Sequence, residues 1–473
     1  METSEFRRHA HALVDWMADY MDEVESYPVR PPVQPGEILD RLPASPPQTG
    51  EPFAEIFEDF CRIIMPGMTH WQHPSFFAYF NANASPPSIL AEMLTATLGA
   101  QCMSWVTSPA ATELEQQVMG WLGSMVGLPP SFAGVIQDTA STATLCAILT
   151  AREVSTHYRI NRKGFSSDDR LTAYCSSEAH SSIEKGLKIA GFGSEQLRKI
   201  PVDERYALLP EALSQAIEAD RARGFIPCLV VAALGTTGST AIDPLRPITE
   251  ICTRHALWLH VDAAYAGAAL LLPELRWMSE GIERADSVVV NPHKWLMTNF
   301  DCSAYFVKDP TALVRTLAIL PEYLKTTESS PVTNYRDWGI ALGRRFRALK
   351  LWFVIRHYGV QGLQEKIRHD NALAQEIASS VGAQPDFELL APVPLNVLCF
   401  RYHPPPISQE EEVNLLNARL LESLNQTGRL FLSHTMLNGL YTLRLCIGQT
   451  NVTRRHAVEA WELIQKTARS LSW

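Results

Sequence analysis

The chain has 473 residues, of which 46% are hydrophobic and 19% are charged. This composition is ordinary for a globular protein and excludes a disordered or fibrous chain, while the length excludes a short binding module. Because 51 acidic side chains oppose 41 basic ones, for a net charge of −10, we expect no general attraction to nucleic acid or to an anionic membrane.

The N-terminal region predicts a helix rather than a signal peptide. Apolar side chains recur there three or four residues apart, with charges between them: Phe6, Ala10, Leu13, Met17, Tyr20 and Val24. No apolar run in the chain approaches the ~18 residues of a membrane span. The nine cysteines are scattered and never spaced as CxxC, which is typical of buried thiols in a reducing compartment. We therefore expect a soluble, cytoplasmic protein.

A proline-rich stretch follows the first helix. Eight prolines between residues 28 and 52 forbid a continuing helix and favour an extended arm. Because the apolar stripe of the first helix must be buried and the arm gives it reach, we expect the helix to pack on a second copy of the chain. Packing within its own chain is the alternative. Residues 1–80 are thus predicted to form an N-terminal helical arm, swapped in a dimer.

From about residue 110 the chain alternates apolar, β-rich runs with helical stretches. Such alternation predicts a largely parallel sheet with helices on both faces, in which ligands lie beyond the carboxyl ends of the strands. We expect this large α/β domain to span residues 81–361. It includes a Thr-, Ser- and Pro-rich stretch near residues 317–336 with little periodicity, which we interpret as a mobile functional loop. A basic helix is predicted from Gly343, and the alternating helices and strands after it predict a small α+β domain over residues 362–473.

Two charged residues stand directly after predicted strands. Asp262 ends an apolar strand and is followed by small residues that let a flat ligand approach. An acid there can pair with a buried cation, although it could also cap a helix or bind a metal. Lys294 closes the apolar run Ser287–Val290. Burying an ammonium is costly, and a lysine with a depressed pKa forms Schiff bases, but a lysine can also reach the surface from such a position.

Two polar turns follow other predicted strands. Thr139, Ala140 and Ser141 begin a helix, whose free N–H groups and dipole suit a phosphate, although simple N-capping gives the same pattern. His180 follows another strand, just before another helix, and a solitary histidine is usually structural. Together, the strand-end acid and lysine, the phosphate-type turn and the histidine form the arrangement of a pyridoxal phosphate site.

The chain resembles the group II pyridoxal-phosphate-dependent amino acid decarboxylases, and most closely the aromatic L-amino acid decarboxylases. The resemblance covers nearly the whole chain and is carried by HPSFFAYF, SWVTSPAATELE, QDTAS, AHSSIEK, LGTTGST, HVDAAYAG, NPHKW, NFDCS, EYLK and LGRRFRALKLWF. It implies the aspartate-aminotransferase-like fold (fold type I), with a seven-stranded-type sheet. It also implies a homodimer with its active sites at the subunit interface.

The resemblance assigns four catalytic residues. Lys294 is implied as the lysine that holds the cofactor covalently, and Asp262 as the partner of the protonated pyridine nitrogen. His180 is implied to stack on the cofactor ring, and Tyr323, on the long loop, to donate a proton to the reacting carbon. The remaining cofactor-binding residues that it implies line the ring or hold the phosphate: Thr139, Ala140, Ser141, Thr237, Ala264, Asn291 and His293.

The substrate implied by the resemblance is an aromatic L-amino acid: tryptophan, phenylalanine, tyrosine, DOPA or 5-hydroxytryptophan. The implied wall combines aromatic, apolar and amide side chains: Trp71, Tyr79, Phe80, Ala82, Gln101, Met103, Phe300 and Gly343. Ala82 lacks a hydroxyl that the family usually has there, Met103 replaces an aromatic residue, and Gly343 is associated with room for an indole. These departures favour tryptophan or phenylalanine over DOPA, although Asn81 could supply a compensating hydrogen bond.

Several other functions compete with this one. The same cofactor supports aromatic acetaldehyde synthesis, which relatives carry out when the loop donor is missing, or decarboxylation of histidine or an acidic amino acid. The Arg344, Arg345 and Arg347 cluster could bind an acidic substrate, but we expect ion pairs instead. A catalytically inactive scaffold and a metal hydrolase built on His260, Asp262 and His293 are further alternatives.

Overall fold

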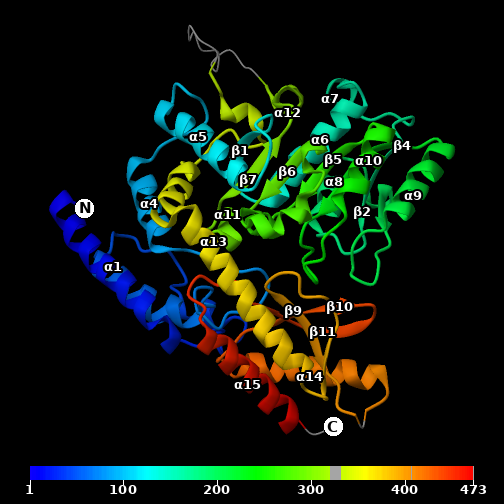
Figure 1. Ribbon diagram of the computed structural model, residues 1–473. Helices are drawn as coiled ribbons and strands as arrows, with labels where there is room; N and C mark the ends of the chain where they lie inside the picture. The colour runs from blue at the N-terminus through cyan, green and yellow to red at the C-terminus, as the bar shows by residue number, and fades with distance from the viewer. Residues whose placement is uncertain (320–331, 406, 472–473) are drawn as a thin grey trace. The chain divides into compact units, whose positions relative to one another are not determined.

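The computed structural model describes residues 1–319, 332–405 and 407–471 (Figure 1). The chain forms two compact units. The smaller comprises Met1–Asn81, Ser379–Leu390 and Phe400–Trp473, and the larger comprises Ala82–Ala378 and Ala391–Cys399. Both ends of the chain therefore belong to the same unit.

The larger unit is built on a seven-stranded sheet with the strand order β1-β7-β6-β5-β4-β2-β3. Strands β2 to β6 run parallel, whereas β7 is antiparallel to both of its neighbours. The strands span β1 Ala133–Gln137, β2 Leu171–Ser176, β3 Leu197–Ile200, β4 Ile226–Ala233, β5 Trp258–Asp262, β6 Ser287–Val290 and β7 Ser303–Val307. The predicted mostly parallel seven-stranded sheet is confirmed.

Helices cover this sheet because its central strands are apolar on both faces. Helix α6 packs across β4 to β7 and against α8 and α12, while α9 and α10 pack on each other and on β4 (Figure 1). The helices of the larger unit span α4 Pro86–Leu98, α5 Pro109–Met125, α6 Ala140–Ser155, α7 Arg159–Lys163, α8 Ser182–Ile189, α9 Pro210–Ala222, α10 Leu245–His255, α11 Pro292–Trp295 and α12 Pro310–Leu317.

A long helix, α13, covers Arg347–Gly382, with a break at Gly359, whose φ of +64° and ψ of 173° are not helical. Glycine adopts such a positive φ without the steric cost that a Cβ would bring. The sequence predicted a basic helix from Gly343, but the helix begins only at Arg347. The preceding residues instead bond to a neighbouring segment, since the backbone N–H of Arg344 donates to Gln101 Oε1 at 2.7 Å and its carbonyl accepts from the Cys102 N–H at 2.9 Å.

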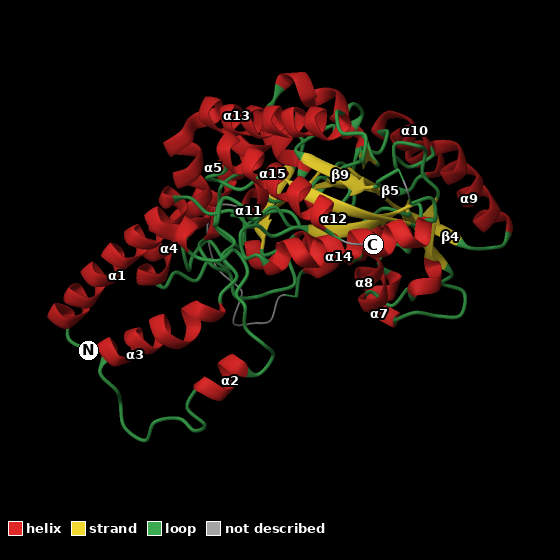
Figure 2. Ribbon diagram, turned by 90° about the horizontal axis from the view of Figure 1, so that it is seen from below, coloured by secondary structure: helices red, strands yellow, loops and turns green. Residues whose placement is uncertain are grey.

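The smaller unit combines helices with a four-stranded sheet of order β10-β11-β9-β8. This agrees with the α+β fold predicted for the C-terminal part of the chain. Its elements span α1 Thr3–Glu23, α2 Glu37–Arg41, α3 Phe53–Asp59, β8 Phe387–Leu389, α14 Glu410–Gln426, β10 Ser433–Leu437, β11 Leu440–Cys446 and α15 Arg454–Ser470. Strand β9, Val397–Tyr402, joins this sheet, although its first three residues are assigned to the larger unit. The proline-rich stretch forms long loops around the short helix α2 (Figure 2).

Helix α1 confirms the predicted N-terminal helix. Trp16 packs edge-on against Phe57 and Phe60, with ring centroids 6.0 and 5.3 Å apart, so one side of α1 contacts the α3 region. Even so, no residue of α1 is fully buried, and Phe6 and Val14 are exposed. Part of the stripe is therefore uncovered in the single chain.

Eight of the nine cysteines are buried and Cys61 is partly buried, all as free thiols. Burial raises the pKa of the Cys102 thiol to about 11, so it stays protonated and unreactive. None of the helices in the described part of the chain is long and apolar enough to cross a membrane.

The three neighbouring arginines form ion pairs within the chain. Arg344 is buried and donates to Glu115 Oε1 at 2.6 Å and to the Ile136 carbonyl at 2.9 Å. Arg345 pairs with Glu92, and Arg347 pairs with Asp301 at 2.9 Å. The Arg344 pair is the deeply buried one, since its guanidinium and the Glu115 carboxylate are both under a tenth exposed.

Replacing one partner of a buried ion pair leaves an uncompensated charge, so Arg344→Met is expected to lower the free energy of unfolding by roughly 3–5 kcal/mol. The matched control is Arg345→Met. Its guanidinium is 56% exposed and its partner Glu92 keeps Lys350 at 2.9 Å, so we expect a loss below about 1 kcal/mol. Urea unfolding of both variants measures the difference, and equal losses would contradict the assigned role of Arg344.

Candidate active site

The candidate site lies at the edge of the large sheet where the parallel strands end. Asp262 is the last residue of β5 and is opposite Ala233, the last residue of β4. On its other side it is opposite Val289, one residue before the end of β6. Because parallel strands in register end at the same edge, the residues that follow β4, β5 and β6 are brought close together.

Asp262 is held by the backbone around it. Its Oδ1 accepts the Ala264 N–H at 3.1 Å, and its carbonyl accepts the Leu234 N–H at 2.9 Å. The next turn approaches closely, because a Cβ built at Gly235 would lie 2.7 Å from the Cβ of Ala266. The small residues after the strand thus let the β4 and β5 turns pack, with Thr237 exposed in one and Ala264 buried in the other.

Lys294 lies in the short helix α11, one turn after β6. Its backbone N–H donates to the Asn291 carbonyl at 3.0 Å, and its carbonyl accepts the Asn83 side-chain amide at 2.6 Å. Asn83 also donates its backbone N–H to the His293 carbonyl at 3.2 Å. These two hydrogen bonds hold Asn83 beside the segment that carries Lys294. Ala82, a predicted substrate residue, is the neighbour of Asn83 in the chain.

His180 is close enough to Asp262 and Lys294 for both charges to act on it. Burial and the Lys294 ammonium lower the pKa of His180, while the Asp262 carboxylate opposes them. The imidazole Nδ1 is bonded to Ser182 Oγ at 2.8 Å and accepts the Ser182 N–H at 3.2 Å. The structure thus brings together three residues that the sequence placed at separate strand ends.

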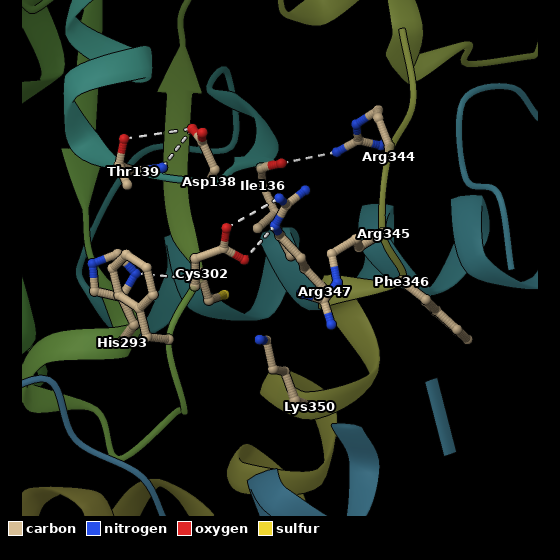
Figure 3. A network of polar contacts seen from close by, with 12 residues as sticks. Ile136, Asp138, Thr139, His293, Cys302, Arg344, Arg345, Phe346, Arg347 and Lys350 are labelled. Atoms are coloured by element: carbon tan, nitrogen blue, oxygen red, sulfur yellow. Dashed lines mark hydrogen bonds and ion pairs between the residues drawn. The ribbon is translucent and has the colours of Figure 1, made fainter. Parts of the chain in front are cut away.

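The predicted phosphate-binding residues come from two segments that the sheet register joins. Gln137, which ends β1, is opposite Ser303 of β7, and Val290, which ends β6, is opposite Ala304. Thr139, the N-cap of helix α6, is therefore at the same edge as Asn291 and His293; Figure 3 labels Thr139 and His293. Ala140 and Ser141 form the first turn of helix α6.

His293 and Asn291 are oriented to donate hydrogen bonds. The Cys302 N–H donates to His293 Nδ1 at 2.8 Å, so the neutral ring carries its proton on Nε2. Burial, helped by Lys294, lowers the pKa of His293 to about 3, which keeps the ring neutral. Asn291 Oδ1 accepts the Ser303 hydroxyl at 2.6 Å, which leaves its NH₂ group as the outward donor. Two N–H donors beside a helix N-terminus fit a phosphate monoester.

Asp138, immediately before this turn, has an acidic side chain. Its Oδ1 accepts the Thr139 N–H at 2.6 Å (Figure 3). The nearby Arg347 guanidinium is bonded to Asp301 at 2.9 and 3.2 Å. The positive charge of Arg347 is therefore already paired with the carboxylate of Asp301.

The predicted substrate residues fall into both units. In the larger unit, Gln101 lies beside Gly343, where an added Cβ would be 3.3 Å from the Gln101 amide nitrogen. The Met103 carbonyl accepts the Arg336 N–H at 2.8 Å. Phe300 packs against His293, with ring centroids 4.8 Å apart. These residues surround the same strand-end region.

Trp71, Tyr79 and Phe80 belong to the smaller unit. Trp71 and Tyr79 stack with centroids 6.0 Å apart, and Phe80 lies under the Arg444 guanidinium at 5.3 Å. Asn81 donates its amide to the Phe76 carbonyl at 2.8 Å and accepts from the Cys446 thiol at 3.5 Å. Both ends of the Asn81 amide are thus bonded within the unit. Tyr323 lies outside the described residues.

Sequence reasoning missed the residues that orient the site. Three residues bond side chains of the candidate site: Ser182, Cys302 and Ser303. The Cys302 contact is made by its backbone N–H, which almost any residue type could supply, so the sequence does not indicate it. The paired serines after His180 were the one available signal.

The metal-hydrolase alternative finds no support in the site geometry. His260 is completely buried, its Nδ1 is bonded to Ser287 Oγ at 2.9 Å, and burial lowers its pKa to about 4. Within residues 1–319, 332–405 and 407–471, no three His, Cys, Asp or Glu side chains are grouped as metal ligands.

The chain matches a family described as the pyridoxal-dependent decarboxylase conserved domain over residues 35–403. It is 42% identical to tyrosine decarboxylase 4 of Petroselinum crispum, covering 100% of this chain and 94% of that protein. It is also 42% identical to phenylacetaldehyde synthase of Arabidopsis thaliana, over 99% and 96% of the two chains.

The fold is similar to the crystal structure of Catharanthus roseus tryptophan decarboxylase in complex with L-tryptophan. The TM-score is 0.94 at 41% identity, covering 100% of this chain and 99% of that one. The predicted fold type I architecture is thereby confirmed. The family model matches most of the chain, and tyrosine decarboxylase 4 is 42% identical to it over its whole length. This chain therefore belongs to the pyridoxal-dependent decarboxylases.

Proposed function

We propose that this protein decarboxylates an aromatic L-amino acid, with pyridoxal 5'-phosphate as cofactor, to yield the amine and carbon dioxide. The observation that carries the proposal is the meeting of His180, Asp262 and Lys294 at one strand-end edge, where the charges of the acid and the lysine both act on the histidine. A binding protein or scaffold needs no such arrangement. The relatives named for tyrosine and tryptophan decarboxylation support an aromatic substrate.

The phosphate group is assigned to the donors beside helix α6. His293 Nε2–H, the Asn291 NH₂ group and the first turn of α6 at Thr139, Ala140 and Ser141 all offer hydrogen to an anion. When bound, the cofactor supplies an electron-withdrawing ring that accepts the electron pair left by the departing carboxylate.

Each catalytic side chain then has a definite task. Lys294 would hold the cofactor through its side-chain amine. Asp262, fixed by the Ala264 N–H, keeps a proton on the pyridine nitrogen by its negative charge. His180 covers one face of the ring, while Thr237 and Ala264 line the other. Tyr323 returns a proton to the reacting carbon.

The pocket residues favour a large, flat side chain without a strict need for hydroxyl groups. Gly343 leaves space beside Gln101, and Phe300 offers an aromatic surface next to His293. Ala82 has no hydroxyl, and the Asn81 amide is bonded to Phe76 and Cys446. These features favour tryptophan or phenylalanine over DOPA.

A second candidate function is aromatic acetaldehyde synthesis, because phenylacetaldehyde synthase is as similar to this chain as tyrosine decarboxylase 4. In that reaction the amino acid would be consumed together with oxygen and water, and aldehyde, ammonia, carbon dioxide and hydrogen peroxide would result. The presence of both Tyr323 and His180 in the sequence favours simple decarboxylation, since a proton donor competes with oxygen for the carbanion.

The protein is further proposed to act as a cytoplasmic homodimer in amine biosynthesis, with its sites at the interface between copies. Helix α4 presents an exposed apolar face that a second copy would bury: Leu90, Met93, Leu94 and Leu98. On helix α1, the exposed side chain of Phe6, a member of the apolar stripe, and that of Val14 beside it support the same proposal.

The reaction and the substrate can be tested together. The pyridoxal-phosphate-loaded protein is incubated with an equimolar mixture of the common amino acids, DOPA and 5-hydroxytryptophan, and every new amine and aldehyde is identified by mass spectrometry. We expect tryptamine or phenethylamine to predominate. Aldehyde alone would contradict the role of Tyr323, a non-aromatic amine would contradict the pocket assignment, and no product would contradict the enzymatic function.

Asp262→Ala is expected to lower kcat by roughly 100-fold or more while some cofactor stays bound, because the charge that protonates the ring nitrogen is lost. Asp262→Asn is the matched control, since the amide keeps the shape and can still accept the Ala264 N–H. If charge is decisive, both variants lose activity alike. Activity near wild type in either would refute the role, as measured by carbon dioxide release and cofactor absorbance.

Tyr323→Phe removes only the phenolic hydroxyl, so it tests the assigned proton donor. We expect the product to shift from amine toward aldehyde, with peroxide formed alongside, because oxygen then reaches the unprotonated carbanion. The ratio of amine to aldehyde at fixed oxygen is the measurement. An unchanged amine yield would count against Tyr323.

A further inference from the structure

His180 is bonded to Ser182, a residue that has no role in the function proposed above. His180 lies between β2 and α8, and Ser182 is the first residue of α8. Ser182 approaches Nδ1 with its hydroxyl at 2.8 Å and its backbone N–H at 3.2 Å. A backbone N–H can only donate, so Nδ1 must be an unprotonated acceptor. The neutral ring therefore carries its proton on Nε2.

Capping of helix α8 explains only part of this contact. The first N–H groups of a helix need acceptors, and a side chain just before the helix often provides one. Here the N-cap residue Ser181 makes no capping bond with its side chain, and the His180 ring accepts the Ser182 N–H instead. The shorter bond, from the hydroxyl of the buried Ser182, is not needed for a cap. It adds a second restraint on the orientation of the ring.

Two charged groups of the site, Asp262 and Lys294, act on the His180 ring. Nε2 makes no hydrogen bond to any residue that the structure describes, so its N–H remains available to a ligand. Burial and Lys294 lower the pKa of the ring, in agreement with a neutral imidazole that donates from Nε2.

We propose that Ser182 is a positioning residue that fixes His180 in the tautomer protonated on Nε2, so that the ring always offers a hydrogen-bond donor to the bound substrate. The proposal rests on the proposed function, because it is the decarboxylase reaction that places a substrate beside His180. Ser182 itself does not touch the reacting atoms. Its influence passes through the protonation and angle of the imidazole.

Such a role affects kcat more than KM. Substrate affinity comes from the whole pocket, whereas the bond at Nε2 orients the substrate for loss of its carboxylate. A ring free to change tautomer would present an acceptor at Nε2 in part of the molecules, and that fraction would be unproductive. A purely structural capping role predicts loss of stability and cofactor with no change in tautomer.

The test compares Ser182→Ala, Ser182→Thr and Ser181→Ala in the pyridoxal-phosphate-loaded protein. Ser181→Ala is the matched control, because it removes a neighbouring hydroxyl that makes no capping bond. The His180 tautomer is read from the ¹⁵N NMR signals of histidine-labelled protein without substrate, with His180→Gln to assign the signal. Bound cofactor, kcat and KM are measured on the same preparations.

We expect one Nε2-protonated tautomer in the wild type, Ser182→Thr and Ser181→Ala. In Ser182→Ala the 2.8 Å hydroxyl bond is lost and only the longer backbone bond of 3.2 Å still holds Nδ1, so we expect part of the molecules to adopt the other tautomer. The kcat of Ser182→Ala should fall about tenfold, as the loss of one hydrogen bond typically gives, with KM and bound cofactor within about twofold of the wild type. Recovery of kcat in Ser182→Thr would show that the hydroxyl is what matters.

Three results would overturn the proposal: a protonated Nδ1 in the wild type, an unchanged tautomer in Ser182→Ala, or an equal loss of kcat in Ser181→Ala. The NMR readout needs no turnover, so it separates this proposal from the proposed function. If the wild type forms no amine from any aromatic amino acid but Ser182→Ala still mixes the tautomers, the function fails and the positioning of His180 by Ser182 stands.

Discussion

The candidate site depends on the register of the parallel strands. Pairing of Asp262 with Ala233 on one side and Val289 on the other makes three consecutive strands end at one edge. Nothing else in the sequence would bring residues near 235, 262 and 294 together. The antiparallel strand β7 extends this arrangement, because its pairing with β1 and β6 adds the start of helix α6 to the same edge. The chemistry of the site is thus set by backbone hydrogen bonds within the sheet.

A second layer of backbone contacts decides which atoms carry protons. The Cys302 N–H bonds His293 Nδ1, and the Ser182 N–H bonds His180 Nδ1. In both rings the nitrogen near the backbone accepts and the other nitrogen must donate. Asn291 follows the same rule, since the Ser303 hydroxyl occupies its carbonyl oxygen and leaves the amide hydrogens outward. The site therefore presents donors, which suits anionic groups such as phosphate and carboxylate.

Much of this arrangement could be predicted from the sequence, and the parts that could not share a physical cause. Strand β6 and the end of β5 were predicted correctly because apolar runs that stop at a single charged residue are strong local signals. The start of α13 was misplaced by four residues because basic residues suit helices in general, while here the Arg344 backbone is bonded to Gln101 and Cys102. The hydrogen bonds that fix His180 and His293 come from neighbouring backbone, and no local pattern records them.

The smaller unit has a consequence for how the protein is made. Its residues come from the first 81 and from the last part of the chain after residue 378. Phe77 donates to the Phe431 carbonyl at 2.9 Å, and Val29 donates to the Gly428 carbonyl at 2.8 Å. During synthesis, the N-terminal segment therefore leaves the ribosome about 350 to 400 residues before these partners do, at a pace of roughly 5–20 residues per second. For tens of seconds the apolar side chains that pack on the late part of the chain, such as Phe76 on Phe431, lack these partners, and exposed apolar surface of this kind favours aggregation.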